Sequence, residues 1–337
     1  MTRITIQDIA KEMGLSRNTV SLALKGSEVV SSSTRQRVYE YAMRVGFFRQ
    51  PEPEYLVMIL RRPNDAAFWD KIMSGIMKEA REENCLIQVG VILEEDIVQS
   101  RFPIGYKENV DAFLFLNVFP ESYVELLLRG GKTGIFLDGD VHMNGSTMPG
   151  DMVKSEGIRS THCMTQALID RGLRRIEFLS CDDVEVCQSV YDRLLGYQQA
   201  MEEAGLPMTT MKELQKLKGR NVYNLQDLNA IMDERTELPE AFVCSNDVIA
   251  GRVIQVLRKR GVRVPEDVAV TGFDNTEEGD AVQFITTADF SAEWLGRRLV
   301  MQMLWRLRHP EAPHEVVIVD SKVIFRNSSA GSEHLQH

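Results

Sequence analysis

The segment that decides the fold of the N-terminal part is Ile4–Gly26, ITIQDIAKEMGLSRNTVSLALKG. It holds two short amphipathic patterns with a glycine between them. Thr5 and Asp8 have the spacing of a capping box, in which each side chain accepts a hydrogen bond from the other residue's backbone amide at a helix start. The apolar spacing predicts helices over 6–13 and 17–24. Two short helices joined across a glycine turn form a helix-turn-helix.

The residues at the helix limits agree with this prediction. Gly14 can adopt the left-handed conformation that ends the first helix, and Ser16 is a suitable N-cap for the second. Ser31–Ser33 precede a third helical pattern, in which Val38 and its neighbours at helical spacing share one side. A third helix would brace the other two, so residues 1–48 are predicted to form a small all-α domain.

The second predicted helix carries side chains that suit the major groove of DNA. Arg17 can donate to O6 and N7 of guanine, and Asn18 can bond N6 and N7 of adenine. Leu22, one turn further on, can contact a thymine methyl group. Hydroxyl groups suit phosphate oxygens, which fix register without reading sequence; the candidates are Thr5, Ser16, Thr19 and Ser21. The alternative is a small solvated bundle on which Arg17 and Asn18 are simply exposed.

The distribution of charge favours a DNA-binding head. The whole chain carries 39 Lys and Arg against 49 Asp and Glu, for a net charge of −10. Residues 1–50 alone carry eight basic and four acidic side chains. A basic head on an acidic remainder fits a local phosphate-binding surface. The alternative is chance, because a segment of this size easily acquires a small excess of one sign.

A short linker follows the head. Residues 49–54 read Arg-Gln-Pro-Glu-Pro-Glu. Two prolines so close together cannot both continue a helix, and the composition is that of a connecting segment. We therefore divide the chain into a head (1–48), this linker, and a body (55–330).

From Tyr55 onward, apolar strand-like runs alternate with amphipathic helical patterns. The alternation predicts an α/β fold with parallel sheets covered by helices on both faces, and the number of units indicates two lobes. Strands are expected at 55–60, 87–92, 112–116, 134–137, 175–180, 241–244, 268–272 and 316–319. Helices are expected at 68–83, 122–129, 160–171, 190–204, 247–260 and 292–307.

The composition argues against several classes of protein. No apolar run is long enough for a membrane-spanning helix, and the first ten residues lack the core of a signal peptide. The five cysteines are scattered and form no CxxC pair. We find no arrangement of nucleophile and base, no metal-ligand motif and no cofactor motif. We therefore expect a cytoplasmic protein that is not an enzyme and needs neither metal nor cofactor.

Several segments together resemble the lac repressor (LacI/GalR) family of transcriptional regulators. In the head these are ITIQDIAKEMGLSRNTVSLALKG and VVSSSTRQRVYEYAMRVGF. In the body they are ALIDRGLRRIEFLS, DRLLGYQQAMEEAG, AFVCSNDVIAGRVIQVLRKRGVRVPEDVAVTGFDN and FRNSS, in the order of the family. The resemblance covers almost the whole chain. It implies a DNA-binding regulator whose body folds like periplasmic sugar-binding proteins, with an effector held between two lobes.

The resemblance also implies effector-binding residues at matching positions: Phe68, Trp69, Arg193, Asn246, Asp247 and Asp274. The two aromatic residues would form walls, and Arg193 would donate to the ligand. The other three follow predicted strands, where open α/β sheets bind ligands. Alternatives stay open for most of them: the aromatic rings can pack against helices, Asn246 can cap the next helix, and Arg193 can pair with a surface carboxylate.

The linker departs from the pattern of the family. The resemblance implies a hinge helix whose leucine wedges into the minor groove, but the Pro-Glu linker is too short for one. We expect instead that rigid spacing of two heads in a homodimer matches the half-sites of a palindromic operator. The function expected is a repressor controlled by a small polar ligand, best fitted by a sugar and also suited by a purine. The alternatives are a solute-binding protein or an enzyme on the same scaffold.

Overall fold

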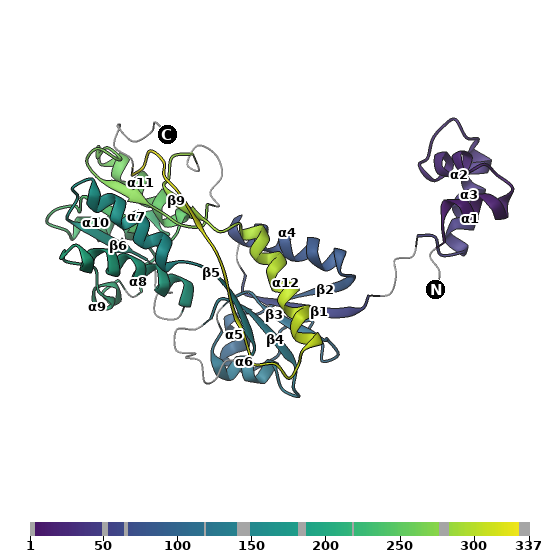
Figure 1. Ribbon diagram of the computed structural model, residues 1–337, viewed down its shortest axis with the longest axis horizontal. Coiled ribbons are helices and arrows are strands. Elements are labelled where there is room, and N and C mark those ends of the chain that lie inside the picture. Colours follow the sequence, from purple (N-terminus) through teal and green to yellow (C-terminus); the bar gives the residue numbers. More distant parts are fainter. Residues whose placement is uncertain are drawn as a thin grey trace. The chain divides into compact units, whose positions relative to one another are not determined.

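A computed structural model describes residues 4–48, 53–63, 67–117, 119–139, 149–180, 187–217, 219–275 and 283–329. The chain divides into two compact units, residues 1–53 and 54–337. The first unit contains the head and most of the linker, and the second contains the body. Figure 1 shows the two units with their helices and strands. The predicted linker lies at this division, and its residues 49–52 fall outside the described part of the chain.

The head consists of the three helices that the sequence predicts: α1 Ile6–Met13, α2 Arg17–Leu24 and α3 Ser32–Arg44. The capping box of Thr5 and Asp8 is present, and Gly14 ends α1 with a φ of 64°. Ser16 caps α2 by accepting the amide of Thr19. The apolar faces of the three helices meet in a small core that includes Ile9, Val20, Val38 and Ala42.

The first lobe of the body is built on a six-stranded parallel sheet with the order β10-β5-β4-β3-β1-β2. Its strands are β1 Tyr55–Arg61, β2 Cys85–Val91, β3 Ala112–Phe115, β4 Thr133–Leu137, β5 Asp151–Ser155 and β10 Val316–Val319. The sequence predicts all of them except β5. That strand contains Asp151 and Lys154, and these polar side chains conceal its apolar pattern.

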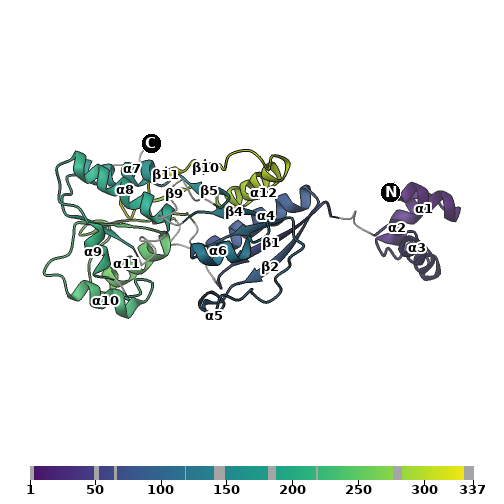
Figure 2. The ribbon, with the colours of Figure 1, turned by 90° about the horizontal axis from the view of Figure 1, so that it is seen from below.

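Helices cover both faces of this sheet (Figure 2). On one face α4 Ala67–Glu82 packs against α12 Ala292–Arg308 over a shared apolar core. The other face is covered by α5 Glu94–Val98 and α6 Glu121–Leu127. The arrangement confirms the predicted layering of helix, sheet and helix.

The second lobe contains a three-stranded parallel sheet with the order β6-β7-β8. Its elements are β6 Ile176–Leu179, β7 Ala241–Cys244, β8 Ala269–Thr271, α7 Ile158–Asp170, α8 Gln188–Glu203, α9 Met211–Gln215, α10 Leu225–Asp233 and α11 Asp247–Lys259. Two separate apolar cores lie on the two faces of the sheet, one with α7 and α8 and the other with α10 and α11.

One feature of the body is not predicted from the sequence. β9 Thr287–Asp289 and β11 Lys322–Ile324 pair antiparallel in a two-stranded ribbon. Both strands are three residues long and adjoin segments where the chain passes between lobes. Within the described residues the chain makes this passage three times, after β5, after β9 and after β10. Strands this short leave no period for sequence analysis to detect.

Candidate functional site

In the head, the first turn of α2 presents the residues predicted to read bases. Arg17 and Asn18 are both exposed. Beside them, Ser16 Oγ accepts the amide of Thr19 at 3.0 Å and lies 2.8 Å from the Thr19 hydroxyl. These bonds fix the start of the helix and leave the two longer side chains free to extend from it.

The remaining predicted DNA contacts differ in exposure. Thr5 is exposed, and its hydroxyl donates to Asp8 Oδ2 at 2.7 Å. Ser21 is half-buried. Leu22 packs against the core of the head with part of its side chain. The geometry therefore places Arg17 and Asn18 as the most accessible groups of the set.

In the body, the predicted aromatic residues begin a row of rings. Phe68 and Trp69 lie at the start of α4 with their ring centroids 4.9 Å apart, and both pack half-buried against the core of the first lobe. Phe68 also contacts Phe290, with centroids 6.0 Å apart. Phe290 in turn stacks on Phe273 at 6.0 Å. The row thus leads from α4 to the segment that carries Asp274.

Arg193 and Asp274 form the polar end of this row. Arg193 Nη2 lies 3.0 Å from Asp274 Oδ1, and the side chains are only 8% and 13% exposed. The guanidinium carbon stands 3.8 Å from the centroid of the Phe273 ring, and Nη1 donates to the Ser245 carbonyl. This pairing excludes the alternative that Arg193 meets a surface carboxylate.

Asp274 has two unusual physical properties. Its φ is 100°, in the left-handed region that residues other than glycine rarely occupy. Burial raises the pKa of its carboxyl group to about 6, against the opposing effect of the Arg193 charge and hydrogen bond. Strained backbone and a shifted pKa are both more frequent at functional sites than elsewhere.

Asn246 and Asp247 lie at the junction of β7 and α11. Asn246 Oδ1 caps the helix by accepting the amide of Ile249 at 2.9 Å, while its Nδ2 donates to the Tyr223 hydroxyl at 3.0 Å. The capping alternative is therefore correct for Asn246. Asp247 is 2% exposed, and a Cβ on Gly272 would stand 2.2 Å from its Oδ1. Only glycine leaves room for that carboxylate.

Two further polar atoms, one on Thr271 and one on Arg193, are buried without a hydrogen-bond partner among the described residues. The Thr271 hydroxyl is fully buried at the end of β8 and has no hydrogen-bond partner within the described part of the chain. The same holds for Arg193 Nε. A buried polar atom without a partner is costly, so a ligand or water is expected there. Thr271 precedes the GFDN motif, which was the available signal.

Two contacts join strands of the first lobe to helix α8. Asp138, directly after β4, accepts hydrogen bonds from the Ser189 amide at 3.0 Å and from Cys187 Sγ at 2.9 Å. Lys154 of β5 pairs with Asp192 at 2.5 Å, with both side chains almost buried. Burial and the neighbouring Asp138 raise the pKa of the Cys187 thiol. None of these residues is among the site residues predicted from the sequence.

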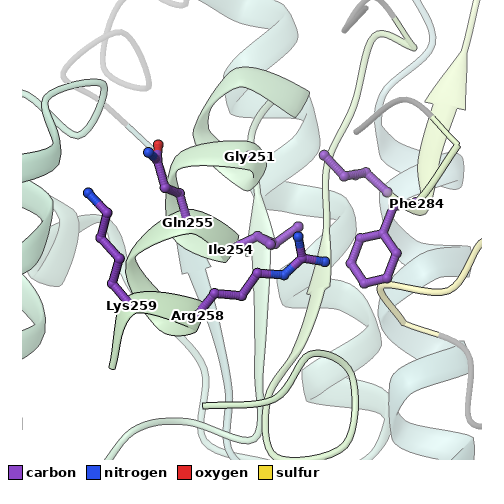
Figure 3. A pocket seen from close by; sticks show the side chains of 7 residues that line it. Gly251, Ile254, Gln255, Arg258, Lys259 and Phe284 are labelled. Carbon is purple, nitrogen blue, oxygen red and sulfur yellow. The ribbon is translucent and has the colours of Figure 1, made fainter. Parts of the chain in front are cut away.

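Two hollows of the body lie elsewhere. One has a volume of about 580 Å³ and is lined by one side of α11 and by Phe284 and Ile285. Figure 3 shows the Arg258 side chain extending toward the Phe284 ring, at 4.8 Å from guanidinium carbon to centroid. A second hollow of about 440 Å³ adjoins Trp294 and the ends of β9 and β10. None of the predicted effector residues lines either one.

The described residues contain neither a candidate metal site nor a candidate membrane-spanning helix. Within the ranges that the structure describes, no three or more His, Cys, Asp or Glu side chains are grouped so that they could hold a metal ion. In the same ranges, no helix combines the length and apolarity needed to cross a membrane.

Comparison with known proteins points to one family. Residues 5–50 match the model of "Bacterial regulatory proteins, lacI family", and residues 165–329 match that of "Periplasmic binding protein-like domain". The chain is 22% identical to the HTH-type transcriptional repressor PurR of Mannheimia succiniciproducens, over 96% of this chain and 98% of that protein. It is 24% identical to the HTH-type transcriptional repressor CytR of Escherichia coli, over 97% of each chain.

The solved structures agree on the fold. The complex of the transcriptional regulator CelR with cellobiose matches with a TM-score of 0.64 and 21% identity, over 97% of this chain and 100% of that one. At this level of identity the likeness concerns the fold.

Proposed function

Because the chain belongs to the lacI family of bacterial regulatory proteins, we propose that its head reads an operator through Arg17 and Asn18 and that its body binds a sugar. It is a DNA-binding transcriptional regulator rather than an enzyme, and it binds as a homodimer to operator DNA. We propose further that it is a repressor and that it acts in the cytoplasm, where its DNA target would be.

The observation that carries the effector proposal is the cluster of Arg193, Asp274 and the aromatic row. A buried carboxylate and a guanidinium can bond adjacent hydroxyl groups, and apolar rings can cover the face of a sugar ring. The buried Thr271 hydroxyl and Arg193 Nε have no partner among the described residues and could satisfy further ligand oxygens. The relative CelR, solved with cellobiose, supports a sugar as the ligand class.

Asp274 also suits a role in switching. Its backbone lies in a strained conformation, and its carboxylate belongs to the second lobe while Phe68 and Trp69 belong to the first. A ligand that contacts both lobes would favour one arrangement of them over another. Operator affinity and ligand affinity would then change by the same factor, because the coupling is reciprocal.

A thermal-shift screen tests the effector proposal. The purified protein is heated with sugars, sugar phosphates and nucleobases in separate wells, since a ligand that binds only the folded state raises the melting temperature. We expect a sugar to raise it in the native protein and to have no effect on Asp274→Ala. Asp233→Ala, which removes an exposed carboxylate on α10, is the matched control and should respond like the native protein.

Two results would overturn parts of the proposal. A shift given by nucleobases alone would replace the sugar as ligand class. A shift that is the same in Asp274→Ala as in the native protein would remove this cluster from the effector site.

A further inference from the structure

The outer side of α3 carries an apolar patch made of Tyr39, Met43 and Phe48, which we call the α3 patch. The three side chains are 51%, 54% and 43% exposed. Tyr39 and Met43 are four residues apart and therefore lie on one side of the helix. The Phe48 ring stands 5.2 Å from that of Tyr39. Val38 and Ala42, on an adjacent side of α3, fill the core of the head.

The α3 patch does not fit DNA. Contacts with phosphate need cations, hydroxyl groups or free amides. The groups that we propose to contact DNA lie instead at the start of α2, where Ser16, Arg17 and Asn18 are exposed. Two of the three side chains of the patch have no hydrogen-bonding group of that kind. An exposed apolar patch on so small a domain is instead typical of a protein contact.

We propose that the α3 patch binds the same patch of a second copy when both heads occupy one palindromic operator. The inference rests on the proposed binding of a homodimer to DNA. A contact across a two-fold axis uses the same surface on both subunits, so that surface must be complementary to itself. The exposed residues beside the patch include Glu40 and Arg44, which have opposite charges. A two-fold axis can therefore place Glu40 opposite Arg44 of the partner subunit.

Because the linker is short, a small patch is sufficient to hold two heads together. Five residues, 49–53, separate Phe48 from Glu54, and even a fully extended chain gains at most about 3.5 Å per residue. The linker is therefore short, and two heads that it joins to one dimer meet at an effective concentration on the order of millimolar. The α3 patch would then hold the two heads at a fixed spacing. It would do so in place of a hinge helix, for which the linker is too short.

The first test compares two DNA duplexes. The full-length protein and Tyr39→Gln/Met43→Gln, which keeps good helix formers on α3, are titrated onto a palindromic operator obtained by selection and onto a duplex with one half-site. We expect the variant to lose about tenfold in affinity for the palindrome and to match the native protein on the single half-site. Met208→Gln, which replaces an exposed methionine in the body, is the control and should lose nothing.

The two arms separate failure of the inference from failure of the proposed function. Equal affinities of variant and native protein for the palindrome would overturn the α3 contact. Equal losses on both duplexes would also overturn it, because they would show damage to the head itself. If the native protein selects no operator at all, the proposed DNA reading fails.

Cross-linking provides a second test, which detects directly whether two α3 patches come together. Met43→Cys and Lys11→Cys are made in a Cys163→Ser background, since Cys163 is exposed, and are treated with a short bismaleimide. We expect Met43→Cys to join two protomers on operator DNA and not on random DNA, and Lys11→Cys on α1 to remain unlinked. A link within one chain, or no excess over Lys11→Cys, would overturn the proposal.

Discussion

At the scale of single residues, Arg17 and Asn18 are the groups that we propose to read the operator, and they lie in one helical turn. Both are exposed beside the Ser16 cap, so removing either should change the proposed DNA contacts and leave the core of the head intact. Arg17→Ala should therefore weaken operator binding by about 1–3 kcal/mol and spare binding to random DNA. Fluorescence anisotropy on both duplexes at one salt concentration measures this.

Lys25→Ala is the control for charge. It removes a cation of the same sign from the C-cap of α2. A contact with phosphate alone would weaken binding to both duplexes alike. If Arg17→Ala behaves in that way too, Arg17 does not read bases.

The pKa of Asp274 predicts an unusual dependence of stability on pH. Burial raises that pKa from 3.8 to about 6, so the folded protein holds the proton more tightly than the unfolded chain does. The resulting stabilisation is complete below pH 4 and is lost as the pH rises through 6. The native protein should lose about 2 kcal/mol relative to Asp274→Asn between pH 4 and pH 7, measured by urea unfolding.

Asp267 gives a control of opposite sign. The hydrogen bonds from the Arg263 side chain and amide lower the pKa of Asp267 to about 2. Its stabilisation is therefore present above pH 4 and is lost as the pH falls toward 2. A difference between native protein and Asp274→Asn that does not change with pH would mean that Asp274 is ionised throughout.

At the scale of elements, two glycines determine how α4 and α12 pack. A Cβ on Gly75 would stand 1.9 Å from the Glu293 carbonyl oxygen, and a Cβ on Gly296 would stand 2.1 Å from that of Ile72. Gly75→Ala or Gly296→Ala should thus force the helices apart and cost about 1–3 kcal/mol, although alanine favours a helix by about 1 kcal/mol. The midpoint of urea unfolding measures the change.

Gly251 in α11 is the matched control, because a Cβ there meets nothing within 4 Å. Gly251→Ala should be neutral or stabilising. If Gly75→Ala shared that outcome, the close approach of the two helices would not exist in solution.

The same elements show what sequence could and could not predict. Helices with caps or clear periodicity, such as α2 and α11, are predicted within a residue at each end. The sequence does not predict β5, β9 and β11, because polar residues interrupt their short apolar runs. In the proposed site, the family resemblance and the position after a predicted strand nominate Asp274, whereas its pairing with Arg193 and Phe273 depends on how distant elements pack.

At the scale of the whole body, side chains of the first lobe hold helix α8 of the second. Asp138 bonds the start of α8, and Lys154 reaches Asp192 one turn further along. These contacts lie beside the first of the three segments that pass between lobes. An effector that rearranges the lobes would have to change these contacts. Their free energy is therefore expected to affect the balance between the two arrangements of the lobes.

The pair of Lys154 and Asp192 offers a direct test of this bridge. Lys154→Met leaves the Asp192 carboxylate buried with Gln188 as a neutral partner, and an unpaired buried charge typically costs about 3–5 kcal/mol. Lys154→Met/Asp192→Leu removes both charges and should recover most of that loss. Arg220→Met, which breaks an exposed pair with Glu234, should cost less than about 1 kcal/mol. Urea unfolding ranks the three variants, and a cost of Lys154→Met no greater than that of Arg220→Met would show that the bridge does not hold the lobes together.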